Sequence, residues 1–599
     1  MPNLRLFSIP AAAPFLPTLI RALMAGELVR GFPARGDPLA LGAATIYLPT
    51  RRACRRARDF FLNEIETDAA ILPRIVALGD IDEDEIVFAQ AATGELAAPA
   101  LELQPALAPL ERRLLLAQLV LKWASGIAPP GAEEAALVPR TPLAALALAD
   151  DLARLMDDMV TRTVPWERLD KLVPDEFDRY WQLTLDFLKI ARLAWPEILK
   201  ERGVIEPAAR RDALLRAEAA RLASGRAGPV IAAGSTGSMP ATAELLATIA
   251  KLPNGAVVLP GLDKELDEEA WGMIADGEVR RPLHHASRTP PPPLRDSRSA
   301  GEDGARGGVS AQLSFTWEDE SPGAVSHPQF AMHALLRRLG ITRAQVIEIG
   351  KTQAASRARL ISEAMRPAAG THRWQALSLP QEAIETISVI EAAHAEEEAL
   401  AIAIALREAV EENKTAALVT PDRGLARRVC AALARWNLHA DDSGGEPLVN
   451  TPAGSFASLA AEAALLGLAP VTLLAFVKHP LMRIATARAI AALEKAVLRG
   501  PRPRPGSANL AHALAAFRDE LAKVRRGEAS DVHPSDPRAR LNERELSDAT
   551  ELVERLERAF SELETMPPEP QPLTELAARH YQLVEGLSSE RTPTPPSRL

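Results

Sequence analysis

The sequence has 599 residues, enough for three or four domains, and its 47% hydrophobic and 25% charged content is ordinary for a soluble globular protein. A formal net charge of −10 argues against a protein that coats nucleic acid over its whole surface, although a local basic channel is compatible with it. Two cysteines are too few for a disulfide framework or a cysteine-only metal site, and no run of about 18 uncharged apolar residues occurs, so we expect a cytoplasmic protein without a membrane span.

Residues 1–275 are predicted to form a parallel α/β domain with a helical insertion at about 82–222. Short β-branched runs indicate strands, and helical spacing of apolar residues indicates helices between and after them. The predicted strands are 4–9, 44–48, 75–78, 229–233 and 256–260. The predicted helices are 14–25, 53–65, 110–124, 142–160, 175–195, 207–222 and 241–251. Because the strand pattern stops and then resumes, we expect helices inserted into one sheet domain.

Four further segments follow in the predicted organisation. Residues 276–327 are rich in proline, glycine and charge, which is typical of a disordered linker. Residues 328–385 are a predicted helical connector, 386–500 a second α/β domain, and 501–599 a helical segment with a disordered tail. Within the second domain, strands at 387–392, 416–420 and 438–441 alternate with helices at 396–410 and 423–436. This alternation predicts a parallel sheet covered by helices.

Nucleotide hydrolysis requires a glycine-rich turn and a lysine that neutralises phosphate. The loop after the first strand contains neither, because it reads Pro10-Ala11-Ala12-Ala13. Gly350-Lys351-Thr352 is only a fragment of a P-loop, since Gln345 stands where its leading glycine belongs. The segment 234–238, GSTGS, could hold an anion on its backbone amides, but no lysine follows it, so we interpret it as a tight turn with Ser238 near the N-cap of a helix.

Carboxylates suggest no metal site. Residues 80–85 and 396–398 are acidic runs, which we interpret as a surface segment and a helix start, although the run at 80–85 could hold a cation weakly. A magnesium-dependent nuclease of the PD-(D/E)xK kind needs an aspartate and an acidic-x-Lys pair on neighbouring strands, and we find no such trio.

Basic residues provide the candidate site. Arg51, Arg52 and Arg55, with Arg56 and Arg58, follow Thr50 at the predicted carboxyl end of a strand. Arginine at such a position can contact a phosphate backbone. The same layout of a strand, a threonine and arginines recurs at Thr420 and Arg423. The alternative is a solvated helix face whose arginines pair with acidic side chains.

The resemblance to a known family begins with these segments. The sequence contains, in order, PTRRACR, VIAAGSTGSMPAT, AVVLPGLD, HPQF, AALVTPDRGLARRV and LLAFVKHPL. It resembles the AddB family, the helicase-nuclease subunits of AddAB double-strand-break repair enzymes, in their alphaproteobacterial form. The resemblance covers about residues 4 to 590, apart from the proline-rich stretch.

This resemblance implies an α/β fold with two RecA-like, superfamily-one helicase-like domains and large helical insertions. It implies an AddA-like helicase-nuclease partner and action on single- and double-stranded DNA ends during recombination, with a cytoplasmic, nucleoid-associated location. The segment 48–51 lies where such helicases contact single-stranded DNA. Thr420 lies where they carry the arginine that reaches the γ-phosphate of ATP.

The sequence departs from the family at the residues that carry activity. It has threonine in place of that arginine, no P-loop lysine, and no DExx motif before 234–238. In the family, ATP is bound by the partner, and magnesium and an iron–sulfur cluster belong to a carboxy-terminal nuclease domain. Neither the motif nor the cysteines of that domain occur here, so we expect a chain shortened before it, with no cofactor of its own.

The sequence therefore predicts an inactivated helicase-like scaffold that guides single-stranded DNA. Its predicted contacts are Thr50, Arg51, Arg52 and Arg55, together with Thr420 and Arg423. Two alternatives stay open. One is a residual NTPase that uses 350–352 or 234–238, and the other is a scaffold that binds only proteins.

Overall fold

The structure is a computed structural model of the whole chain. It describes residues 4–33, 39–65, 71–78, 103–126, 141–167, 179–224, 228–275, 326–351, 355–567, 569 and 571–589. The acidic run at 80–85 falls outside these ranges, and the predicted linker at 276–327 and the predicted disordered tail at 588–599 fall almost entirely outside them. The chain separates into two compact units, Met1–Ser388 and Val389–Leu599.

The first unit is built on a six-stranded sheet in the order β3-β2-β4-β5-β1-β6. All of its strand pairs are parallel, so the predicted α/β fold with a parallel sheet is confirmed. The strands are β1 Leu6–Ile9, β2 Thr45–Leu48, β3 Arg74–Ala77, β4 Val230–Ala233, β5 Gly255–Pro260 and β6 Ile347–Glu348. Strand β4 pairs with β2 through Thr45 and Val230, although about 180 residues separate the two in sequence.

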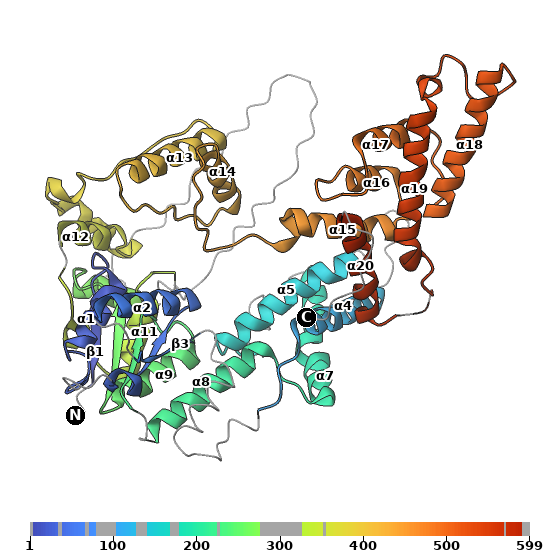
Figure 1. Cartoon of the computed structure of the whole chain (residues 1–599). Helices are drawn as coiled ribbons and strands as arrows, with labels where there is room; N and C mark the ends of the chain where they lie inside the picture. Colours follow the sequence, from blue (N-terminus) through green and yellow to red (C-terminus); the bar gives the residue numbers. More distant parts are fainter. Residues whose placement is uncertain are drawn as a thin grey trace, which may run out of the picture. The chain divides into compact units, whose positions relative to one another are not determined.

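Helices cover both faces of this sheet, because successive strand residues point to opposite sides. Residues such as Ile46 and Leu48 pack under α1, Phe15–Met24, and α2, Arg51–Glu64 (Figure 1). Tyr47 and its counterparts on neighbouring strands pack on the other face. The helices there are α8 Pro207–Ala223, α9 Pro240–Lys251, α10 Glu268–Ala275 and α11 Phe330–Leu339.

Between β3 and β4 the described chain is helical and has a core of its own. Trp195, Leu116 and Leu152 are buried in that core. The helices are α4 Pro109–Gly126, α5 Pro142–Thr161, α6 Arg179–Lys189, the π-helical turn Ile190–Ala194, α7 Trp195–Arg202 and α8.

The predicted connector at 328–385 is joined to the sheet domain. Its first helix, α11, is part of the core on one face of the sheet. Its next helix, α12 Ala355–Ala364, is followed by Arg366, whose side chain is 4% exposed and lies 2.8 Å from Asp267 just before α10. This ion pair, in which the arginine is buried and the aspartate is partly exposed, links the end of α12 to the sheet domain.

The second unit begins with two packed helices, α13 Ala395–Glu411 and α14 Arg423–Ala434. Residues 386–443 are all described, and they contain no strand, so the strands predicted at 387–392, 416–420 and 438–441 are wrong. Val389 is 85% exposed and Val419 is 93% exposed. A β-branched run favours extended backbone, but a strand also needs a neighbour that completes its hydrogen bonds, and these segments have none.

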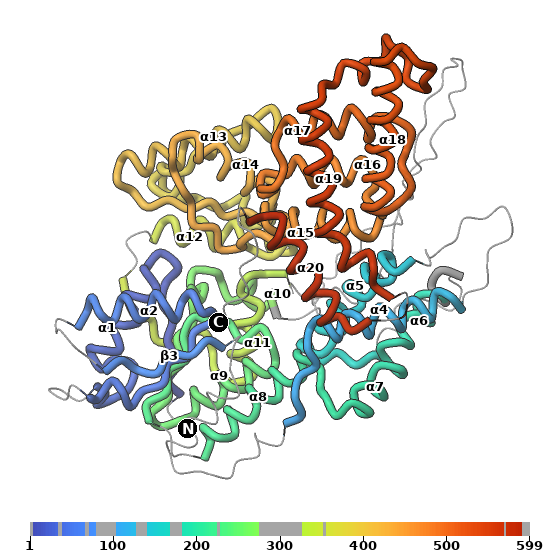
Figure 2. Tube along the Cα trace, turned by 45° about the vertical axis from the view of Figure 1, so that its right-hand side comes forward, coloured from blue at the N-terminus to red at the C-terminus, as the bar shows by residue number. Residues whose placement is uncertain are grey.

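The remainder of the second unit is a helical bundle. Phe456, Phe476 and Phe560 lie at its centre, and Figure 2 shows α17, α18 and α19 side by side. The helices are α15 Pro452–Leu465, α16 Pro470–Val477, α17 Ala487–Leu493 with a π-helical turn at Glu494–Leu498, α18 Ser507–Arg526, α19 Glu543–Glu564 and α20 Leu573–Ser588. In the described part of the chain, no helix combines the length and apolar character needed to cross a bilayer.

Candidate nucleic-acid interface

The predicted site in the first unit begins where β2 ends. Strand β2 ends at Leu48 and α2 starts at Arg51, so only Pro49 and Thr50 join them at the carboxyl edge of the sheet. Thr50 has extended backbone, and its Oγ1 accepts a hydrogen bond of 3.1 Å from the Ala53 N–H. Thr50 is therefore the N-cap of α2, and its hydroxyl hydrogen can still be donated to a ligand.

The arginines of α2 are exposed because the helix buries its opposite face. Cys54, Ala57 and Phe61 recur at helical spacing and are buried under the helix. Arg51 and Arg55 lie on the other side of it. All five arginines of the segment are exposed, namely Arg51, Arg52, Arg55, Arg56 and Arg58.

The positive charge of this surface is concentrated near the N-terminus of α2, where the helix dipole disfavours cations. The first turn of α2 contains no acidic residue. Each cation near a helix N-terminus opposes the macrodipole, at a cost of roughly 0.3–1 kcal/mol. The acid Glu64 lies at the far end of α2, where it binds Arg21 at 2.8 Å, and Arg58 donates to the Ile75 carbonyl at 3.4 Å. An anion at the start of α2 would be attracted by both the arginines and the dipole.

The GSTGS loop adjoins this surface. Gly234 has φ +80°, and a Cβ there would lie 3.3 Å from Pro49 Cδ, so the loop passes directly beside the β2–α2 connection. Gly237 also has positive φ, and its N–H donates to Ser235 Oγ at 3.3 Å. The N-cap of α9 is Met239, which provides no side-chain hydrogen bond. The segment is therefore a tight turn, as one of the two interpretations predicted, and the N-terminus of α9 that follows it has no side-chain cap.

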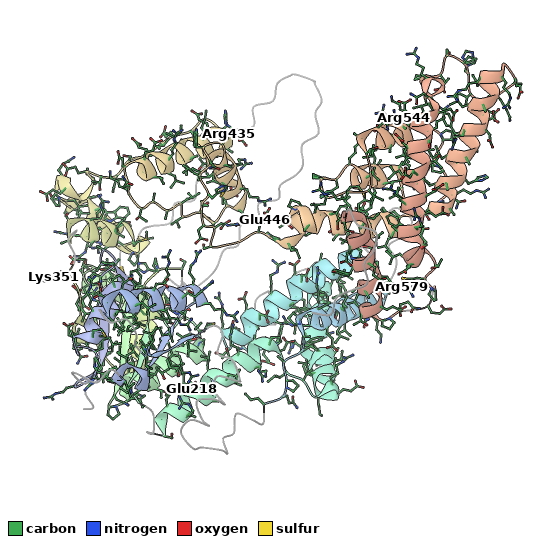
Figure 3. All side chains as sticks on the ribbon, in the orientation of Figure 1. Glu218, Lys351, Arg435, Glu446, Arg544 and Arg579 are labelled. Atoms are coloured by element: carbon green, nitrogen blue, oxygen red, sulfur yellow. The ribbon has the colours of Figure 1, made fainter. Side chains whose placement is uncertain are left out.

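The structure does not bring the P-loop fragment to this surface. Gly350 and Lys351 follow β6, at the edge of the sheet away from β2, and Figure 3 labels Lys351 there. Thr352 lies outside the described residues. After β1, the Ala13 N–H donates to the Pro10 carbonyl at 3.0 Å and closes a short turn.

The predicted site in the second unit differs from the one on α2. Asp422 caps α14 by accepting from the Gly424 N–H at 2.7 Å, and its own N–H donates to Thr420 Oγ1 at 3.0 Å. Arg423 is bidentate to Asp442, with one bond of 3.0 Å, and also donates to the Gly445 carbonyl. Its guanidinium is thus committed to partners within the chain, and the acid-paired interpretation holds for Arg423. Thr420 ends an extended segment and not a strand.

Comparisons with known proteins give no family. No protein-family model matches the sequence, and no curated protein matches it. Among the described residues, no group of three or more His, Cys, Asp and Glu side chains is placed to hold a metal ion.

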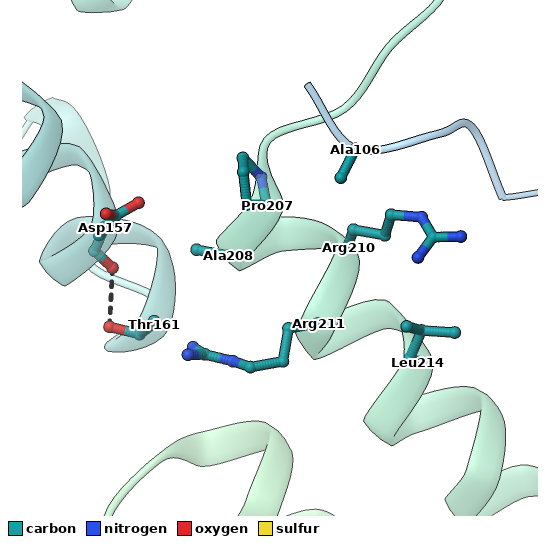
Figure 4. Close-up of a pocket in the computed structure, with 8 residues that line it drawn as sticks. All are labelled: Ala106, Asp157, Thr161, Pro207, Ala208, Arg210, Arg211 and Leu214. Atoms are coloured by element: carbon teal, nitrogen blue, oxygen red, sulfur yellow. Dashed lines mark hydrogen bonds between the residues drawn. The ribbon is translucent and has the colours of Figure 1, made fainter. Parts of the chain in front are cut away.

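The sequence did not indicate a hollow of about 420 Å³ between α5 and α8 (Figure 4). Asp157, Thr161, Arg210 and Arg211 are among its lining residues. Behind it, the buried Arg112 binds Asp157 at 2.9 Å and Glu206 at 2.9 Å. The lining residues are spread over about 100 positions of the sequence, so they form no local motif that could have indicated the hollow.

Glu206 makes the stability of this region dependent on pH. Burial raises the pKa of its carboxyl group, against the lowering effects of Arg112 and the Trp195 N–H. The folded state therefore holds the proton more tightly, and stability decreases as pH rises from about 4.5, the ordinary value. We expect Glu206→Gln to flatten this fall in the free energy of unfolding of the first unit as pH rises above about 4.5, measured by urea denaturation. The exposed neighbour substitution Glu197→Gln is the control, and equal slopes for both variants would contradict the assignment.

Proposed function

We propose that this chain is a helicase-like scaffold that contacts the backbone of single-stranded DNA through the start of α2. In this proposal it acts as an AddB-like subunit beside an AddA-like helicase-nuclease that processes DNA ends during double-strand-break repair. ATP hydrolysis is assigned to the partner, and this chain guides the strand.

The observation that supports the proposal most is the exposed arginine surface at the carboxyl edge of the sheet. In open parallel α/β sheets, ligands bind beyond the carboxyl ends of the strands. Arg55 and Arg56 are exposed there, next to the N-terminus of α2 and the Gly234 turn. Phosphate contacts of this kind tolerate any base sequence, because they involve the backbone only.

Thr420 and Arg423 contribute less to this proposal than the sequence suggested. Arg423 would have to leave Asp442 before it could bind a phosphate. Arg427, one turn further along α14, is exposed, and its Nε donates a long hydrogen bond of 3.4 Å to the Arg423 carbonyl. If α14 contacts DNA, Arg427 is better placed than Arg423 to do so.

Salt-dependent binding tests the proposal. The full chain would be titrated with a fluorescein-labelled 20-nucleotide oligo-dT between 50 mM and 500 mM salt. Each phosphate contact adds about 0.7 to the slope of log K against log salt, so Arg51→Ala with Arg55→Ala is expected to reduce the slope by about 1.4.

The matched control is Arg162→Ala with Arg359→Ala, which removes two exposed arginines that lie on other elements of the same unit. Its slope should equal that of the unmodified protein. If the α2 variant also behaves like the control, α2 does not contact DNA, and the interpretation of this chain as a scaffold that binds only proteins gains support.

A further inference from the structure

The helical bundle of the second unit has a basic hollow of about 730 Å³. It lies between the end of the π-helical turn that follows α17 and a short helix, Pro537–Arg540, that precedes α19. Its polar lining consists of Lys495, Arg499, Asp536, Arg538 and Arg540. We refer to the hollow lined by these residues as the basic hollow. Four cations thus surround one carboxylate.

The cations fall into two groups. Arg538 is bidentate to Asp536, and this pair lowers the pKa of the Asp536 carboxyl group. Arg499 binds Glu494 at 2.9 Å through Nε. Lys495 and Arg540 are exposed, and neither has an ion pair or side-chain hydrogen bond in the described part of the chain. The paired arginines therefore fix the walls, while the other two charges face solvent.

The loop after α17 adds further charge and is held in place. Arg502 and Arg504, in the proline-rich segment RGPRPRPG, are exposed and also make no described ion pair. The Gly506 N–H donates to the Gly467 carbonyl at 3.0 Å. A Cβ on Gly500 would lie 3.0 Å from Arg538 Nη1, so the two sides of the hollow are in contact. This segment is therefore a docked loop.

Local backbone geometry supports a site here. The helix that begins at Ala487 passes into a π-helical turn at Glu494–Leu498, and this turn carries Lys495. Single π-helical turns inside helices are rare and occur frequently at functional sites. Here the π-helical turn contains Lys495, one of the two cationic lining residues without an ion pair in the described chain.

We propose that the basic hollow, together with Arg502 and Arg504, binds a segment of single-stranded nucleic acid by its phosphates. Its volume lies in the range of pockets that hold organic ligands, about 300–1,000 Å³, and so suits part of a nucleotide chain better than one ion. Two lining residues, Pro501 and Pro537, have no N–H, so the hollow offers few backbone donors for an acidic peptide. No exposed aromatic side chain lines it, and the contact is therefore independent of base sequence.

This inference goes beyond the proposed function, because it concerns a different unit and does not require the α2 surface. The test uses the full chain and the same labelled oligo-dT. Lys495→Ala with Arg540→Ala is expected to reduce the salt slope by about 1.4, which is roughly 25-fold weaker binding at 0.1 M salt if these contacts vanish at 1 M salt. Both side chains are exposed, so the fold should tolerate the change.

The control removes two arginines from the other end of the same bundle. Helices α17 and α19 run antiparallel, since Arg488 binds Asp548 whereas Arg555 donates to the Ile484 carbonyl. Arg483 and Arg558 are exposed near that second contact, away from the hollow. Arg483→Ala with Arg558→Ala should leave the slope unchanged.

Three outcomes would overturn the inference. The first is a slope for the hollow variant equal to that of the control. The second is unchanged DNA binding together with lost binding of inorganic tripolyphosphate, which would make the hollow a small-anion site. The third is displacement by poly-glutamate at the concentrations at which oligo-dT binds. If the slope of log K against log salt falls for Lys495→Ala with Arg540→Ala but not for Arg51→Ala with Arg55→Ala, this inference is supported and the proposed function fails.

Discussion

Replacement of Glu218 by alanine is expected to destabilise the first unit by about 3–5 kcal/mol, the cost of breaking a buried ion pair. Glu218 lies on α8, is 2% exposed, and binds Arg221 through bonds of 2.8 and 2.7 Å. It also accepts a hydrogen bond from the hydroxyl of Tyr47, which is 1% exposed. Without the carboxylate, the largely buried Arg221 and the Tyr47 hydroxyl would both lose their partner.

The variant Tyr47→Phe separates the contribution of the Tyr47–Glu218 hydrogen bond from that of the Glu218–Arg221 ion pair. It removes only the neutral donor and keeps the ion pair, so we expect a loss of about 1 kcal/mol. Burial raises the pKa of Tyr47 and so does Glu218, which keeps the phenol protonated as a donor. Urea denaturation measures the free energy of unfolding of both variants, and hydrogen exchange at β2 measures the local effect. A loss for Glu218→Ala no larger than that for Tyr47→Phe would show that Arg221 finds another partner or becomes hydrated.

The sheet of the first unit could be predicted because its strands carry their own signal. Runs such as 229–233 and 256–260 are buried on both faces, so they are apolar throughout and short, as parallel strands are. Their order in the sheet could not be read in the same way. Strand β4 inserts between β2 and β5 through contacts that are distant in sequence. No local pattern determines such a pairing.

The second unit shows the limit of pattern alone. Helices α13 and α14 were predicted within two residues of their observed ends, because each buries a stripe of alanine, leucine or valine. The neighbouring runs at 387–392 and 416–420 had equally good β-branched composition, but they form no strand pairing with any other part of the chain that the structure describes. A helix satisfies its own backbone, whereas a strand depends on another segment.

The candidate sites also differ in whether their residues are close together in sequence. The arginines of α2 lie within eight residues that follow a strand, so this cluster could be recognised in the sequence. The basic hollow joins residues near 495–501 to residues 536–540, and only the fold brings these together. Arg423 was predicted to contact DNA, but its ion-pair partner Asp442 could not be identified from sequence. Charge that is local can be predicted, whereas its pairing depends on tertiary structure.

Replacement of Phe61 by alanine is expected to cost about 3–5 kcal/mol and to disorder the arginine surface. Phe61 is fully buried under α2, in the core that contains Ile46 and Leu48. Its neighbour Leu62 is 59% exposed on the same helix. Leu62→Ala should therefore change stability by less than about 0.5 kcal/mol.

This pair of variants tests the orientation on which the proposed function depends. The helix can present Arg51 and Arg55 outward only if its other face is anchored by Phe61. Hydrogen exchange over residues 51–64 should rise strongly in Phe61→Ala and remain unchanged in Leu62→Ala. Oligo-dT binding should weaken in the first variant alone, although neither substitution removes a charge. If both variants exchange alike, α2 is rotated, and its arginines face the core side of the helix and not a ligand.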